Sequence, residues 1–432
     1  MTLHILQILL SFILLTAPAW GVSGDGFTIE RIEIRGNEKT KSDIILRALT
    51  FHAGEALSSS EVDASKLALY QTRLFKTVHL ASKPGTDVNQ AVVVVYVDEK
   101  QFGELGVSGE YTELDGFGVS ADAYHVNLRG EAKIVGAAWG AGERLKQWGF
   151  SYADPWFTHA DLLFSVGIRG SSADRDIFRD KNPLARGRYD LERIGGTIAV
   201  GRPVGTGHRL LFRYSYDEFQ VGAFKRPEVV TDRGEFADEV GFAAASGGRQ
   251  SLAFVGLDLH RKPSLDPWGS TPGTDFRVKV DLSARYLGSP DNFVKLDGQF
   301  YRHFATRGRQ ILSIGTRAGA VFGSEPFFER FFLDGEKQLR GFERREIGPE
   351  GGEEFVSAEI LYSIPFSDVG RGYGFVEAAA VHRDFVTGSR ADQGATAGIG
   401  VLLFNRIDIS LGLGTGTLII KSHRFGGINV GL

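Results

Sequence analysis

Residues 276–286 alternate strictly between apolar and polar side chains. The apolar or small face is formed by Phe276, Val278, Val280, Leu282, Ala284 and Tyr286. The polar face is formed by Arg277, Lys279, Asp281, Ser283 and Arg285. The same period of two recurs at 212–217 and at 407–414. Because successive side chains of a β-strand point to opposite faces, this pattern predicts long strands with one apolar and one polar face.

Residues 26–99 follow a second pattern, which mixes the helical period with short strands. Segments rich in apolar and β-branched residues, typical of strands, lie at 27–34, 75–81 and 91–97. Between the first two strands, Thr40 is expected to cap a short helix, and the serines at 58–60 precede a second helix. We therefore predict a small α+β domain over 26–99, in the order strand, helix, helix, strand, strand.

The first residues of the chain are typical of an export signal. Residues 5–15 are apolar apart from Gln7 and Ser11, and the run is too short to span a bilayer, which needs roughly 20 residues. A small-x-small cleavage sequence follows at 17–19. We predict a signal peptide over 1–19; the alternative is a buried helix of a soluble domain. No apolar run of about 18 residues follows, which argues against a helical membrane protein.

Composition narrows the class of protein further. The 432 residues include 56 glycines, 32 phenylalanines, 12 tyrosines and no cysteine. Without cysteine, a thiolate metal site, a catalytic thiol and a lipid-modified N-terminal cysteine are excluded. The net charge of −4 and the lack of a basic run interleaved with aromatics argue against a nucleic-acid partner. Abundant glycine together with aromatics is typical of closed β-barrels.

From about residue 100 onward, the alternation fits either a soluble sandwich or a membrane barrel. The export signal, strands near the about 9–11 residues of a tilted membrane strand, and large charges on the polar face favour the barrel. A membrane-spanning sheet must close on itself to satisfy its backbone hydrogen bonds. At roughly 21 residues per strand with its share of turns, segment 100–432 would form about 16 antiparallel strands. The charged segments 171–190 and 225–250 are expected to be extracellular loops.

The sequence contains no recognisable catalytic motif. It has no G-x-S-x-G, no H-E-x-x-H and no G-x-x-x-x-G-K sequence. The ten histidines are scattered, and His125, His159 and His303 are interpreted as lumen or loop residues rather than ligands. We therefore predict that the protein is not an enzyme and that it has no catalytic residue, no cofactor and no metal site.

The segment 325–352 has a distinctive sequence, EPFFERFFLDGEKQLRGFERREIGPEGG. It resembles the sixth extracellular loop of the outer membrane protein 85 superfamily, whose hallmark tripeptide matches Arg340, Gly341 and Phe342. Other phrases similar to the family are YADPWF, LDPWGSTPGTDFRVKV and SAEILYSIPF, and IERIEIRGN and LYQTRLFKTVHL resemble a polypeptide-transport-associated (POTRA) domain. The resemblance covers the small domain and most of the barrel, and implies a surface-antigen-like member with a single POTRA domain.

The resemblance also implies a role for the tripeptide as a loop lock. The loop would fold into the barrel lumen, where Gly341 allows a tight backbone approach and Arg340 meets carboxylates on the inner wall. Guanidinium is planar, permanently charged and able to form two parallel hydrogen bonds to a carboxylate. By resemblance its partners are Glu359 and Glu377; the family usually has Asp where this chain has Glu377. The alternative is an exposed loop with ordinary surface charges.

The resemblance implies an outer-membrane protein that inserts or translocates polypeptides, with its POTRA-like domain in the periplasm. That domain would offer a strand edge to its clients by β-augmentation. The implied partners are unfolded outer-membrane or secreted polypeptides, outer-membrane lipid and accessory assembly proteins. Two alternatives stay open: a passive pore or structural barrel, since fold does not imply function, and a two-partner-type secretion transporter.

Two features near the chain ends bear on these alternatives. Too few residues separate Ala19 from Phe27 for the N-terminal plug helix expected of a secretion transporter, which favours membrane insertion. A single POTRA-like domain is fewer than the five of a typical barrel-assembly protein or the two of a secretion transporter. At the other end, Ile428, Val430 and Leu432 alternate with small or polar residues and predict the last lipid-facing strand.

Overall fold

The computed structural model divides the chain into two compact units, Met1–Lys100 and Gln101–Leu432. It describes residues 27–112, 116–158, 162–178, 186–204, 208–222, 249–261, 272–333, 339–342, 347–348, 351–367, 369–385, 388–403, 407–413 and 418–422. The signal peptide predicted over 1–19 lies outside the described residues, as does the alternation at 428–432.

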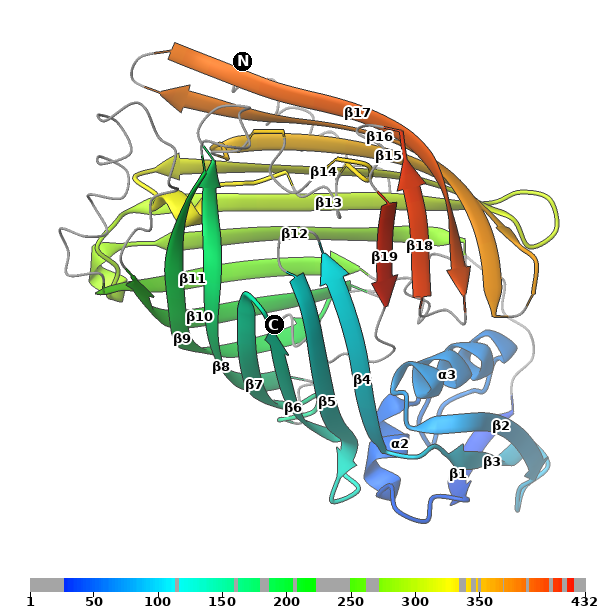
Figure 1. The fold of residues 1–432 in the computed structure, drawn as a ribbon. Coiled ribbons are helices and arrows are strands. Elements are labelled where there is room, and N and C mark those ends of the chain that lie inside the picture. Colours follow the sequence, from blue (N-terminus) through cyan, green and yellow to red (C-terminus); the bar gives the residue numbers. More distant parts are fainter. Residues whose placement is uncertain are drawn as a thin grey trace. The chain divides into compact units, whose positions relative to one another are not determined.

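The N-terminal unit is a three-stranded sheet with two helices (Figure 1). Its elements are β1 (Thr28–Arg35), α2 (Ser42–Ala48), α3 (Ser59–Gln71), β2 (Phe75–Pro84) and β3 (Gln90–Glu99). The strand order is β1-β3-β2, with β3 parallel to β1 and antiparallel to β2. The predicted order of strands and helices is confirmed. Neither helix, nor any other in the described part of the chain, is long and apolar enough to cross a membrane.

The two helices begin in different ways. Ser58 caps α3 in a capping box: its hydroxyl accepts from the Glu61 amide at 3.3 Å, and the Glu61 carboxylate accepts from the Ser58 amide at 3.1 Å. The predicted cap at Thr40 is wrong, because Lys41 is the N-cap of α2 and provides no side-chain hydrogen bond. Thr40 is buried instead, and its amide donates to the Glu99 carboxylate at 2.7 Å. This bond ties the segment before α2 to the end of β3.

The C-terminal unit is one sheet of sixteen strands among the described residues. The strands are β4 (Gly103–Thr112), β5 (Gly116–Leu128), β6 (Lys133–Gly142), β7 (Leu145–Asp154), β8 (Leu163–Phe178), β9 (Arg186–Pro203), β10 (His208–Val221), β11 (Arg249–Arg261), β12 (Gly273–Ser283), β13 (Phe293–Ala305), β14 (Ile311–Gly323), β15 (Glu354–Pro365), β16 (Gly370–Phe385), β17 (Gly388–Leu403), β18 (Ile407–Gly412) and β19 (Leu418–Ser422). Each pairs antiparallel with its neighbours in sequence, and β4 and β19, at the two ends of the order, contact each other. The predicted barrel of about 16 antiparallel strands is confirmed.

The outside of the barrel wall is apolar, and its inner face carries charged and polar side chains beside an apolar cluster. On β10, Phe212, Tyr214 and Tyr216 are exposed, whereas Arg213 and Asp217, which alternate with them, are buried. A water-soluble protein reverses this arrangement, because its apolar face forms the core. An apolar exterior around a polar interior is the arrangement of a transmembrane barrel. The alternation that predicted the strands therefore separates a lipid-facing side from a lumen-facing side.

Two sequence expectations for this unit need correction. The strand expected over 276–286 ends at Ser283, and residues 285–287 form a short 3-10 helix, because the chain turns at Gly288 with φ of +102°. Most of the loop expected at 171–190 is a long hairpin, since β8 continues to Phe178 and β9 begins at Arg186. The loop expected at 225–250 lies mostly outside the described residues.

Candidate functional site

The segment between β14 and β15 is closed at its base and attached there to the inner wall. The short 3-10 helix η2 (Phe327–Glu329) follows β14. Lys295 of β13 donates to the carboxylate of Glu329 at 3.0 Å and to its carbonyl at 2.7 Å. Phe331 and Gly352 exchange two backbone hydrogen bonds of 2.9 Å, which close the base of the loop. The Phe331 ring packs against the Phe355 ring of β15, with centroids 4.7 Å apart.

The tip of this loop is a tight turn at residues 339–342. The Phe342 amide donates to the Leu339 carbonyl at 3.2 Å, and Leu339 is buried against the wall. Gly341 has φ of +95°, a conformation that side chains rarely adopt. Its backbone also touches β18: a Cβ added to Gly412 would lie 2.3 Å from the Arg340 carbonyl oxygen. Glycine at both positions lets the turn lie directly on the strand.

Glu359 and Glu377 occupy the wall beneath this turn. They are directly opposite each other in the register of β15 and β16, a position in which like charges destabilise a sheet. Arg340 lies between them: its Nη2 donates to Glu359 at 2.7 Å, and its Nε donates to Glu377 at 2.6 Å. The Arg340 backbone amide adds a third bond, to the other Glu377 oxygen at 2.7 Å. One residue of the loop thus bridges the two carboxylates, offsets one of their two charges and satisfies both Glu377 oxygens.

The Arg340 guanidinium also stacks on aromatic rings of β16. It lies 4.0 Å from the Phe375 ring centroid and 5.5 Å from that of Tyr373, within the range of cation–π attraction. Gly398 on β17 makes room for this platform, because an added Cβ would lie 2.5 Å from the Phe375 ring. Phe375, Gly398 and Gly412 are partners in register across β16, β17 and β18. The loop tip therefore lies over three residues in register, Phe375, Gly398 and Gly412.

The structure brings together all five residues singled out in the sequence. The exposed fractions of the side chains are 12% for Arg340, 24% for Glu359 and 2% for Glu377, so the contact is shielded from solvent. Phe342 packs against the buried apolar cluster of the inner wall. Sequence reasoning missed the supporting residues Lys295, Phe375, Gly398 and Gly412, because their roles depend on which strands are neighbours and in what register.

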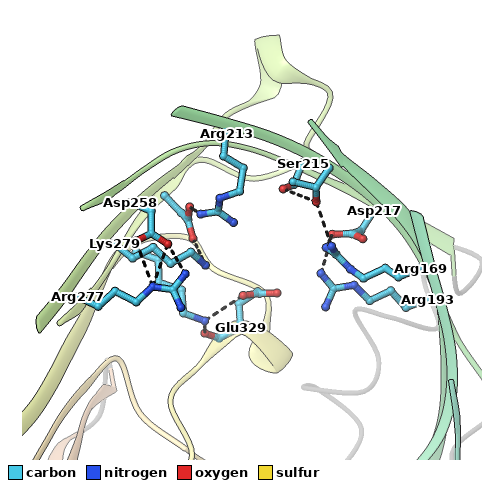
Figure 2. A network of polar contacts seen from close by, with 12 residues as sticks. Arg169, Arg193, Arg213, Ser215, Asp217, Asp258, Arg277, Lys279 and Glu329 are labelled. Atoms are coloured by element: carbon cyan, nitrogen blue, oxygen red, sulfur yellow. Dashed lines mark hydrogen bonds and ion pairs between the residues drawn. The ribbon is translucent and has the colours of Figure 1, made fainter. Parts of the chain in front are cut away.

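A second set of polar contacts covers the inner wall over β8 to β13 (Figure 2). Its members are cations paired with nearly inaccessible carboxylates: Arg169 and Arg193 with Asp217, Arg213 and Lys279 with Asp281, Arg277 with Asp258, and Lys295 with Glu329. Asp217 accepts from Arg169 at 2.8 Å and from Arg193 at 2.6 Å. The base of the loop, through Glu329, is therefore part of the same charged surface.

Two of these ion pairs cross over an intervening strand. Arg169 on β8, Gly195 on β9 and Asp217 on β10 are in register, and a Cβ on Gly195 would lie 1.8 Å from the Asp217 carboxylate. The second pair repeats this arrangement across β10, β11 and β12, where Arg213, Gly256 and Asp281 are in register. A Cβ on Gly256 would lie 2.3 Å from the Asp281 oxygen. We call Gly195 and Gly256 the glycine gaps, because each lets a pair join two strands that are not neighbours.

Among the described residues, no group of three or more histidine or acidic side chains is arranged to hold a metal ion. The site consists of contacts that hold a loop to the barrel wall. The described residues of the β14–β15 segment are held at its base by Lys295 and at Arg340 by the carboxylates of β15 and β16.

The structure combines a sixteen-stranded barrel with an apolar exterior, a loop held inside it and a small βααββ unit before it. These features define an outer-membrane barrel protein of the POTRA-bearing class. Comparison with protein families agrees with this class. Residues 127–415 match the Omp85 superfamily domain, and residues 27–100 match the POTRA family described as surface antigen variable number repeat. The chain belongs to the Omp85 superfamily. Its barrel lies in the outer membrane and its POTRA domain in the periplasm.

Relatives share this architecture. The outer membrane protein assembly factor BamA of Nitratidesulfovibrio vulgaris is 25% identical over 370 residues, which cover 80% of this chain and 44% of that protein. BamA of Neisseria meningitidis serogroup B is 23% identical over 376 residues, covering 78% and 44%. The chain thus spans less than half the length of the relatives it matches.

Solved structures with the same fold include BamA from Haemophilus ducreyi lacking POTRA domains 1–3. It has a TM-score of 0.63 and 17% identity, with coverage of 93% of this chain and 84% of that one. CdiB from Escherichia coli has a TM-score of 0.53 and 14% identity, covering 95% and 93%. At these identities the likeness concerns the fold alone.

Proposed function

We propose that this chain inserts polypeptides into the outer membrane. Its relatives are named outer membrane protein assembly factors, which supports this proposal. The observation that carries the proposal is the contact of Arg340 with Glu359 and Glu377. A barrel that served only as a wall would not need a loop tip buried on its inner face and fixed by three charge-assisted hydrogen bonds. The activity needs no covalent step, cofactor or metal ion.

In this proposal the Arg340 contact holds the wall from β15 to β18 in one arrangement. Arg340 joins β15 to β16, and the Gly341 backbone rests on β18. These strands lead to β19, which contacts β4. We infer that the tripeptide acts as a loop lock, and that its occupancy sets how firmly this part of the wall is held while a client is handled.

The POTRA domain would receive clients along the outer edge of β2. The first part of β1, the other edge strand, is already paired: the Ile29 amide donates to the Glu55 carbonyl at 2.8 Å, and Gly54 donates back to Ile29 at 2.7 Å. On β2, the Val78 amide donates to the Tyr70 hydroxyl rather than to β3. Amides along an antiparallel strand point alternately to one neighbour and to the other. Ser82 is four residues after Val78, so its amide also points to the outer edge. An extended client can add to such an edge by β-augmentation.

Ser82→Pro tests this edge. Proline removes an amide that β3 does not use, and edge strands tolerate it, whereas Ser82→Ala keeps the amide and serves as the matched control. We expect crosslinking of unfolded outer-membrane polypeptides to the POTRA domain to fall in Ser82→Pro and to persist in Ser82→Ala. Equal crosslinking in both variants would move client binding away from this edge.

Depletion of the protein in cells tests the function as a whole. A role in insertion predicts that many outer-membrane proteins fall together. The second candidate, a two-partner-type secretion transporter, shares its fold with CdiB, and it predicts that one secreted substrate accumulates in the periplasm. A passive pore predicts neither effect and would contradict the proposal.

A further inference from the structure

A cavity of about 620 Å³ lies at one end of the barrel, where the turn between β13 and β14 runs beside the end of β15. Its lining residues are Arg307, Gly308, Arg309, Gln310, Ile364, Pro365, Phe366 and Ser367. The cavity is of the size that ligand sites in proteins occupy, about 300–1,000 Å³. Of these described lining residues, two are arginines and none is acidic.

This cavity lies at the periplasmic end of the wall. Strand β4 starts just after Lys100, where the periplasmic unit ends. Neighbouring strands are antiparallel throughout, so every second turn returns to the end at which β4 begins. The turns that follow β13 and β15 are both of this kind. The cavity therefore opens at the level of the inner leaflet of the outer membrane.

The turn that carries the two arginines is held in a fixed conformation. The Thr306 amide donates to the Gln310 carbonyl at 3.0 Å, and the Gln310 amide donates to the Arg307 carbonyl at 3.2 Å. The Tyr362 hydroxyl of β15 donates to the Gln310 side chain at 2.6 Å, so the turn is tied to the neighbouring strand. Arg307 and Arg309 are exposed on this turn. Two guanidinium groups two residues apart are thus presented over one cavity.

The exterior beside the cavity is apolar and aromatic. Phe366, Ile364, Phe304 and Tyr362 are exposed by 62%, 47%, 42% and 36% on the lipid-facing side of the wall. The guanidinium of Arg302 already stacks on Phe304, at 5.6 Å from the ring centroid. Aromatic rings at the end of a membrane strand mark the level of the lipid headgroups. A positive charge and an apolar surface therefore meet at this level.

We propose that this cavity is a binding site for an anionic glycerophospholipid of the periplasmic leaflet. The lipid phosphate would accept hydrogen bonds from Arg307 and Arg309, since guanidinium binds phosphate through paired N–H groups. Its acyl chains would lie along the exterior at Ile364 and Phe366. Neither part suffices alone: a soluble phosphate gains nothing from the apolar surface, and a neutral lipid gains little from the arginines.

The test uses the full-length protein in detergent micelles, with bound lipids counted by native mass spectrometry. The probes are phosphatidylglycerol, phosphatidylcholine and soluble glycerol phosphate. The wild type is expected to retain phosphatidylglycerol in preference to phosphatidylcholine. Each basic side chain near a membrane surface favours anionic lipid by about fivefold, so Arg307→Gln with Arg309→Gln should reduce the preference by about 25-fold. Arg129→Gln, on the turn after β5 at the same end, is the matched control; it removes one basic side chain outside the cavity and should lower the preference by at most about fivefold.

Folding of each variant is checked by the shift in gel mobility on heating. Three results would overturn the site: equal retention of the two lipids by the wild type, an equal loss of preference in Arg129→Gln, or displacement of the lipid by glycerol phosphate at equal concentration. The last result would assign the arginines to a soluble anion. None of these readouts depends on protein insertion, so the site and the proposed function can fail separately.

Discussion

Glu359 and Glu377 face each other across the β15–β16 ladder, and Arg340 donates a hydrogen bond to each of them. Without that arginine, two carboxylates would lie opposite each other on a shielded wall. The strand pair and the loop are therefore energetically coupled. The loop tip is held by the wall, and the wall keeps its two charges at low cost only while the tip is in place.

Arg340→Ala should release the loop tip without unfolding the barrel. Removing one partner of a buried ion pair costs about 3–5 kcal/mol, and water in the lumen should reduce that cost. We expect normal heat-modifiable mobility, increased proteolysis between β14 and β15, and impaired function in cells. A loop as protease-resistant as in the wild type would contradict the lock.

Arg340→Lys separates charge from geometry. An ammonium ion keeps the charge but cannot form the fork of hydrogen bonds to two carboxylates. We therefore expect poor rescue in the same proteolysis assay. An exposed surface pair would be worth about 0–1 kcal/mol and would tolerate lysine, so full rescue would show that the charge alone suffices.

Gly412→Ala should also displace the tip, without changing any charge. The added Cβ would lie 2.3 Å from the Arg340 carbonyl oxygen, so the turn must move off β18. Gly372→Ala on β16 is the matched control, since an added Cβ there has no neighbour within 4 Å. We expect loop proteolysis to increase only in Gly412→Ala. An equal effect in both variants would point to general weakening of the sheet.

Gly195→Ala should break the Arg169–Asp217 pair by filling the glycine gap between them. Overpacking of this kind costs about 1–3 kcal/mol, which should lower the temperature at which the barrel unfolds in the gel-mobility assay. Gly196→Ala, one residue along and on the outer face, is the control, because its added Cβ makes ordinary contacts of 3.4 and 3.7 Å. A similar temperature for both variants would mean that the gap is not needed.

The contact between Glu30 and Thr86 in the POTRA domain should depend on pH. The Thr86 amide donates to the Glu30 carboxylate at 2.6 Å, and this bond, together with the Thr86 hydroxyl and Arg31, lowers the pKa of Glu30 below its usual 4.5. A lowered pKa means that the contact stabilises the fold above about pH 4.5 and is lost as pH falls through the folded value. We expect hydrogen exchange at the Thr86 amide to be protected at neutral pH and to lose that protection in acid. In Glu30→Gln, protection that depends equally on pH would assign the effect to another group.

Local patterns predicted most of the fold and part of the site. Alternation along β10 and β12 predicted strands because each residue has only two sides to face, lipid or lumen. The tripeptide at Arg340 was found by resemblance. A contact between Arg340 and Glu377 was expected because glutamate has a longer side chain than the aspartate that the family usually has there. Thr40 misled because the helix begins one residue later, with Lys41 as N-cap, and the Thr40 amide is held by Glu99 of β3, a contact between residues far apart in the sequence. The glycine gaps could not be predicted, since they depend on the register of three strands.

The glycine gaps also discriminate between correct and incorrect alignments of the strands as the barrel forms. A slip of one residue turns every apolar side chain inward and is rejected by the hydrophobic pattern alone. A slip of two residues keeps that pattern and would escape such rejection. It would, however, place Arg193 or Thr197 beneath the Arg169–Asp217 pair in place of Gly195, so the pair could not close. The absence of a side chain at the glycine gap therefore distinguishes the native strand register from registers shifted by two residues.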